Sequence, residues 1–109
     1  MMDKDDITEI INACAEEKIL FLPHAIRQMS RPERMITPSE IRNVIQKGEI
    51  IEDYPDDVRG HSCLMLGFGE TGRPIHVVCS PKDAYLSVIT AYLPDVNGWR
   101  KDFKKGNKQ

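Results

Sequence analysis

The segment FLPHAIRQMSRPERMITPSEI, residues 21–41, contains a histidine and arginines whose spacing could serve phosphate chemistry. His24, Arg27 and Arg31 stand at positions i, i+3 and i+7, so a helix would present them on one face. An imidazole titrates near neutral pH and can give or accept a proton. A guanidinium binds phosphate oxygens through paired N–H groups. We therefore interpret this segment as half of a candidate site that needs a second proton carrier.

The second proton carrier is expected on a β-hairpin formed by residues 74–92, PIHVVCSPKDAYLSVITAY. Turn residues near its middle separate two runs of strand-forming residues. In the simplest register His76 pairs with Thr90, and Tyr92 follows on the same face. An apolar patch on that face leads up to these polar residues. It comprises Val78, Leu86 and Val88. A helix that carries His24 could cover the polar end.

These residues suit the cleavage of RNA by its own 2′-hydroxyl group. His24 and His76 would be the acid and base that move protons to the leaving oxygen and from the hydroxyl. Arg27 would stabilise the charge that develops on phosphorus, and Thr90 or Tyr92 would orient the substrate. The remaining candidate substrate-binding residues are Arg31 and Arg73. The expected reaction requires no metal and no cofactor.

Two other classes of function remain open. A noncatalytic module could use the same basic face to bind nucleic acid or a protein partner, with arginines that are merely solvated or paired with Glu52 or Asp53. A metal-binding domain is the weaker alternative. A zinc site could be built from His61, Cys63, His76 and Cys79, or from His61, Cys63 and Cys79 alone. Their spacing is not typical of zinc ligands.

The bulk composition predicts one small cytoplasmic domain. The chain has 109 residues and a net charge of −2, so general coating of nucleic acid is not expected. Residues 23–34 carry three positive charges against one negative, whereas residues 35–58 carry two against six. The start MMDKDDITEI lacks the features of a signal peptide, and no apolar run is long enough to span a membrane. Three widely spaced cysteines indicate reduced, buried thiols.

Hydrophobic periodicity predicts helices at residues 6–17, 23–31 and 38–47. Asp6 is expected to cap the first helix, with Glu9 three residues later. The last helix begins with a complete signal, because Thr37 can cap it, Pro38 suits its first turn and Glu40 completes a capping box. Gly48 is expected to end that helix in the left-handed conformation.

After Gly48 the periodicity changes to two, which predicts strands at residues 49–54, 61–68, 74–80 and 84–92. Their links have the composition of hairpin turns. The short run ILFL, residues 19–22, is either a strand or an extended connector. We therefore predict an α+β fold with N-terminal helices packed on a four-stranded antiparallel sheet. Trp99 and Phe103 predict a docked helical turn, followed by a basic end.

Three stretches of the sequence resemble a small bacterial family, domain of unknown function 4258, from about Pro23 to Trp99. They are LPHAIRQMSRPERMITPSEIRNVIQKGEIIEDYPDD, GRPIHVV and VITAYLPD. His24, Ala25 and Arg27 match the start of the family pattern, and residues 48–52 match its middle. His76 matches the strand histidine. The end of the pattern is matched by Thr90, Tyr92 and Pro94. Where the family often has a glycine, this chain has Pro32, Glu33 and Arg34, so the loop before Thr37 is expected to differ.

The family is similar in predicted fold to the RelE/ParE-like toxins, within the barnase-like ribonuclease architecture. The resemblance therefore implies a metal-independent ribonuclease of toxin type, with RNA as the substrate and an antitoxin as a partner. It also implies three parts to the chain. These are an acidic N-terminal helix and leader at residues 1–22, a RelE-like α+β domain at residues 23–99, and a basic tail at residues 100–109.

Overall fold

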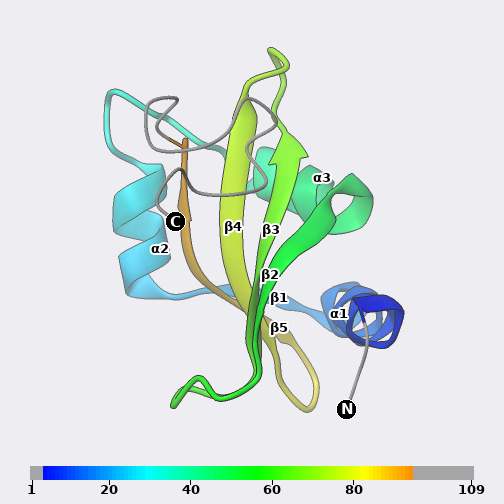
Figure 1. Cartoon of the computed structure of the whole chain (residues 1–109). Coiled ribbons are helices and arrows are strands. Elements are labelled where there is room, and N and C mark those ends of the chain that lie inside the picture. The colour runs from blue at the N-terminus through cyan, green and yellow to red at the C-terminus, as the bar shows by residue number, and fades with distance from the viewer. Residues whose placement is uncertain (1–3, 95–109) are drawn as a thin grey trace, which may run out of the picture.

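The computed structural model describes residues 4–94, which form three helices and a five-stranded sheet (Figure 1). The elements in chain order are α1 (Lys4–Glu17), β1 (Ile19–Phe21), α2 (Pro23–Met29), α3 (Pro38–Lys47), β2 (Glu49–Tyr54), β3 (Ser62–Phe68), β4 (Pro74–Pro81) and β5 (Leu86–Tyr92). This α+β architecture was predicted from the sequence. The expected helical turn at Trp99 and Phe103 and the basic end lie outside the described residues.

The sheet has the strand order β1-β5-β4-β3-β2. Strands β2 to β5 form the predicted antiparallel meander. The prediction of only four strands was wrong, because β1 pairs in parallel with β5. Two further hydrogen bonds hold this segment, from Leu86 N to Lys18 O (2.8 Å) and from Leu22 N to Val88 O (3.1 Å). The three-residue strand thus satisfies the otherwise unpaired outer edge of β5.

Two β-bulges interrupt the alternation of side chains. In β2, Ile50 pairs with Met65 and Glu52 pairs with Leu64, so Ile51 is an extra residue. In β5, Val88 pairs with Cys79 and Thr90 pairs with Val78, so Ile89 is an extra residue. Because one extra residue reverses the faces of all later side chains, each strand changes face at its bulge.

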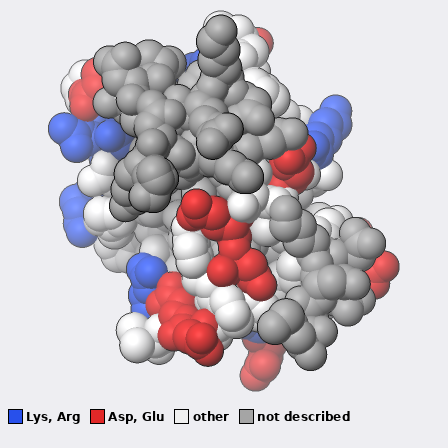
Figure 2. Space-filling view, in the orientation of Figure 1, with Lys and Arg blue, Asp and Glu red and all other residues white. Residues whose placement is uncertain are grey.

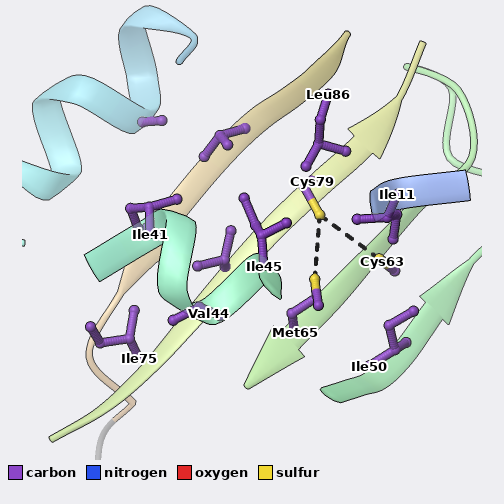
Figure 3. Packing of buried hydrophobic residues seen from close by; sticks show 14 of the residues in the cluster. Ile11, Ile41, Val44, Ile45, Ile50, Cys63, Met65, Ile75, Cys79 and Leu86 are labelled. Carbon is purple, nitrogen blue, oxygen red and sulfur yellow. Dashed lines mark hydrogen bonds between the residues drawn. The ribbon is translucent and has the colours of Figure 1, made fainter. Parts of the chain in front are cut away.

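The main hydrophobic cluster fills one face of the sheet beneath the helices (Figure 3). Ile75 and Val77 of β4 belong to it, together with Ile41, Val44 and Ile45 of α3. α1 and α2 contribute one apolar side each. Their buried residues in the cluster are Ile7, Ile11, Cys14, Ala25 and Met29. All three cysteines are buried and none forms a disulfide, as predicted.

Helix α3 begins as its sequence predicts and ends differently. The Thr37 hydroxyl accepts a hydrogen bond from Glu40 N, and the Glu40 carboxylate accepts one from Thr37 N, which completes the capping box. Gly48 is not left-handed, as we had expected, but extended, with φ −79° and ψ −174°. Glycine is needed there for space, because a Cβ atom would lie 2.4 Å from Leu66 O. Asp6 is likewise not a cap, since α1 already includes Lys4.

A buried ion pair between Arg73 and Glu40 ties α3 to the turn between β3 and β4. Arg73 Nη2 lies 3.0 Å from Glu40 Oε1, and Glu40 is only 4% exposed. The same guanidinium donates to Arg34 O (2.6 Å) and Met35 O (3.0 Å), and Glu70 N donates to Glu40 Oε2 (3.0 Å). One ion pair therefore holds the loop before α3, the start of α3 and the β3–β4 turn together.

We predict that Glu40→Gln lowers the free energy of unfolding at pH 7 by about 2 kcal/mol, because hydrogen bonds to a charged group are lost. Burial raises the pKa of the Glu40 carboxyl, but the hydrogen bonds from Arg73, Glu70 N and Thr37 N outweigh it, and the pKa lies below its ordinary value of 4.5. This stabilisation is therefore present above about pH 4.5 and is lost as the pH falls through the lowered pKa.

Urea denaturation across this pH range measures the effect. The difference between wild type and Glu40→Gln should shrink as the pH falls below 4.5. Glu70→Gln is the matched control, because it removes the charge of an exposed carboxylate in the adjoining turn. Equal stability of wild type and Glu40→Gln at pH 7 would contradict the central role of this ion pair.

Candidate functional site

His76 lies on the sheet face opposite the main cluster. Its neighbours Ile75 and Val77 both belong to that cluster, and alternate residues of a strand point to opposite faces. The imidazole is fully buried and pairs across the sheet with Tyr92, in place of the predicted pairing with Thr90. Nδ1 lies 3.4 Å from the Tyr92 hydroxyl oxygen, and the two rings meet edge to face with centroids 5.4 Å apart. His76 and Tyr92 therefore form one polar unit.

The predicted register was wrong because it contained no bulge. Thr90 pairs with Val78, and this pair lies two residues along each strand from the pair of His76 and Tyr92. His76, Thr90 and Tyr92 therefore still share a face. The predicted apolar patch is divided, because Leu86 and Val88 belong to the main cluster on the other face. The polar cluster that the sequence suggested is therefore present, but a different pairing produces it.

Two residues of β2 extend this unit, and sequence reasoning did not select either as a site residue. The Tyr54 hydroxyl donates a hydrogen bond to the Glu52 carboxylate. Burial raises the pKa of Tyr92, and the negative charge of Glu52 raises it further. Burial also raises the pKa of Tyr54, followed by its hydrogen bond to Glu52 and the Glu52 charge. We call His76, Tyr92, Glu52 and Tyr54 the His76 cluster.

The bulge in β2 explains how Glu52 joins the cluster. Regular alternation would place Ile50 and Glu52 on the same face. The extra residue Ile51 instead leaves Ile50 in the core and turns Glu52 to the opposite face, where it pairs with Leu64. The only signal in the sequence was the run EIIEDY, whose two consecutive isoleucines break the alternation.

The basic residues of the candidate site lie on or just after α2. His24 and Arg27 are exposed, while Ala25 and Met29 of the same helix are buried. Arg31 was predicted on the same helix face, but α2 ends at Met29. Its guanidinium instead pairs with Glu33, with Nε 2.8 Å from Oε2, and both side chains are more than half exposed. The helix therefore presents one histidine and one arginine to solvent.

His24 and His76 occupy different environments. α2 lies beside β5 and starts where Leu22 N donates to Val88 O (Figure 1). His76 pairs with Tyr92, four residues farther along β5, which corresponds to about 13 Å along the strand. α2 buries Ala25 and Met29 in the main cluster, on the sheet face opposite His76. Joint action of the two histidines on one phosphate therefore requires both closer approach and exposure of His76.

The other predicted ligands have separate roles. The Arg73 guanidinium, a candidate for substrate binding, makes the hydrogen bonds to Glu40, Arg34 and Met35 described above. The four candidate zinc ligands do not converge, because His76 faces away from Cys79 and the His61 ring contacts Asp53. Within residues 4–94, no group of three or more His, Cys, Asp or Glu side chains is arranged to hold a metal ion.

The surface charge around β2 is acidic. Figure 2 shows Asp and Glu side chains gathered over β2 and the turn after it, while most visible Lys and Arg atoms lie toward the edges of the view. The acidic residues of this stretch are Glu49, Glu52, Asp53, Asp56 and Asp57. A phosphate would be repelled from this surface and would find the exposed guanidinium of Arg27 on α2 instead.

We predict that Glu52→Gln shifts the ionisation of Tyr54 to lower pH. The substitution removes the negative charge that disfavours the phenolate. Tyrosinate ultraviolet absorbance measured against pH reports the change, with Tyr54→Phe to assign the transition and circular dichroism to follow folding. Asp56→Asn removes an exposed carboxylate of the next turn and should leave the transition nearly unchanged. An unchanged Tyr54 transition in Glu52→Gln would contradict the interaction between Glu52 and Tyr54.

Comparison with known proteins identifies a family for this sequence. No curated protein and no solved structure shows significant similarity to the chain. None of the helices in the described range has the length and apolarity required to cross a bilayer. Residues 21–93, which contain α2, α3, the meander and every residue of the His76 cluster, match the family described as Domain of unknown function (DUF4258). The chain therefore belongs to the DUF4258 family.

Proposed function

We propose that this chain is a metal-independent endoribonuclease of toxin type that cleaves RNA through the 2′-hydroxyl group. The observation that carries the proposal is the fully buried His76, which contacts the Tyr92 hydroxyl on the sheet, together with the exposed His24 and Arg27 of α2, the helix that lies beside β5. The first group can move protons and the second can bind a phosphate. RelE-like architecture, the cytoplasm as compartment and RNA as substrate are parts of this proposal.

In the proposed reaction the scissile phosphate lies against α2. Arg27 binds two phosphate oxygens and offsets the charge of the phosphorane. His24 and His76 act as acid and base, one taking the 2′ proton and the other protonating the 5′ oxygen. Tyr92 couples to His76 through their 3.4 Å contact, and Thr90 stands beside them to orient the ribose. Glu52 adds a negative charge that can stabilise the positive charge His76 gains when it accepts a proton.

One observation favours a second function, a noncatalytic module that binds nucleic acid. His76 is fully buried, so it can touch a substrate only after the surrounding residues move. If they do not move, the imidazole–phenol pair is a structural contact, and the exposed Arg27 guanidinium with His24 on the same helix remains as the binding surface. RNA binding would then depend on salt and on Arg27 but not on Tyr92.

Cleavage of a short RNA by the purified protein separates the two functions. We expect cleavage in the presence of a strong chelator, products with 2′,3′-cyclic phosphate ends, and no cleavage of RNA with a 2′-deoxy residue at the cut site. His24→Ala and His76→Gln should each lower the rate by about 10²- to 10⁴-fold, the usual contribution of positioned proton transfer. Arg27→Lys should also lower it, because lysine lacks the planar fork.

Matched variants control for charge and folding. Tyr92→Phe removes only a hydroxyl, and Tyr85→Phe makes the same change near the β4–β5 turn. Arg27→Ala is compared with Arg42→Ala, which removes an exposed arginine from α3. Loss of cleavage in Tyr92→Phe and Arg27→Ala, but not in their controls, supports the endoribonuclease function. Binding without cleavage, weakened by Arg27→Ala alone, supports the binding module instead.

We extend the proposal to an antitoxin partner of acidic character. The exposed cations of α2 would steer such a partner to the proposed phosphate site, and its binding would block that site. We expect the native host to yield a complex with a small acidic protein, and Arg27→Glu to abolish copurification. If wild type and Arg27→Glu both copurify with the partner, the partner does not bind at α2.

A further inference from the structure

Three sulfur atoms meet in the core on the sheet face opposite the His76 cluster. Cys63 of β3 and Cys79 of β4 pair directly across the two strands, and their Sγ atoms lie 4.0 Å apart (Figure 3). Met65, two residues along β3 on the same face, places its Sδ 3.8 Å from Cys79 Sγ. Cys79 therefore contacts two sulfur atoms from neighbouring positions of one strand.

Both distances from Cys79 Sγ match the sulfur–sulfur spacing around a three-coordinate metal ion. Two metal–sulfur bonds of about 2.3 Å that enclose 120° place their sulfur atoms about 4.0 Å apart. A disulfide requires about 2.05 Å, so the two cysteines are separate thiols at this spacing. Cys79 Sγ is therefore already at a distance from Cys63 Sγ and from Met65 Sδ that a shared ion would require.

The surroundings select the kind of ion. Cys63, Met65 and Cys79 are at most 1% exposed, and they belong to the main hydrophobic cluster with Ile11 of α1 and Leu86 of β5. Magnesium and calcium require oxygen ligands, and structural zinc requires four donors. A set of two thiols and one thioether in an apolar core instead suits a soft ion that accepts few ligands.

We propose that Cys63, Cys79 and Met65 form a binding site for a soft monovalent metal ion, with Cu(I) as the representative ion. Binding involves no change of oxidation state. The ion replaces the proton of one thiol, which gives a neutral centre of one thiolate, one thiol and one thioether, and displacement of the second proton leaves one negative charge. Affinity should therefore rise with pH.

Competition with a chromophoric Cu(I) chelator under anaerobic conditions tests the site in the reduced, full-length protein. We expect one Cu(I) per chain, and X-ray absorption should show sulfur ligands only. Cys63→Ala and Cys79→Ala should each weaken binding by more than about 100-fold, since even outer partners of a metal site contribute 10- to 100-fold. Met65→Leu keeps the volume of the side chain and should weaken binding by about tenfold, because a thioether is the weaker ligand.

Cys14→Ser is the matched control, because Cys14 is the third buried cysteine and its thiol donates to Lys82 O (3.2 Å). It should leave Cu(I) binding unchanged. Circular dichroism verifies the fold of each variant, and Met65→Leu still tests the site if a cysteine variant does not fold. Failure to compete with the chelator, nitrogen or oxygen ligands in the absorption spectrum, or unchanged binding in both cysteine variants and Met65→Leu would each overturn the proposal.

Discussion

The two β-bulges are the constraint on which the candidate site depends. Each inserts a single isoleucine, Ile51 in β2 and Ile89 in β5. In both strands the bulge reverses the alternation, so that Ile50, Val88 and Ala91 face the core while Glu52 and Tyr92 face the opposite side. One strand can therefore contribute Val88 to the main cluster and Tyr92 to the contact with His76. Without the bulges, Glu52 and Tyr92 would point into the hydrophobic core, where an unpaired carboxylate is strongly destabilising.

The Arg73–Glu40 ion pair has a comparable role at the other end of the meander. Glu40 is both the last residue of the capping box and the partner of Arg73, so the start of α3 and the β3–β4 turn share one buried charge. Gly69 makes this possible, because a Cβ atom at that position would lie 2.1 Å from Glu40 Oε2. Arg73 precedes His76 by only three residues. The ion pair therefore also fixes the first residues of the strand that carries the imidazole.

Local sequence signals predicted most of the helices and strands. The pairing of strands that are distant in the sequence could not be predicted in the same way. Thr37, Pro38 and Glu40 located α3, because a capping box is encoded within four residues. The strands of the meander were located by alternation and turn composition. In contrast, the run ILFL carries no signal for its parallel partner, and the extra residues Ile51 and Ile89 resemble ordinary strand residues. The register of His76 was therefore wrong, although its association with Tyr92 on one face was correct.

The environment of the candidate site residues also depends on contacts between distant parts of the chain. Sequence spacing identified exposed cations on α2 and a histidine on β4, but it could not reveal that His76 is fully buried or that Arg73 is held by Glu40. Phosphate binding depends on the short exposed face of α2, and proton transfer depends on an imidazole that solvent does not reach. A buried imidazole that contacts a phenol is stable without any substrate, so its presence alone does not require catalysis. Catalysis therefore requires His76 to become accessible beside Arg27, because only then can the imidazole and the α2 guanidinium act on the same phosphate.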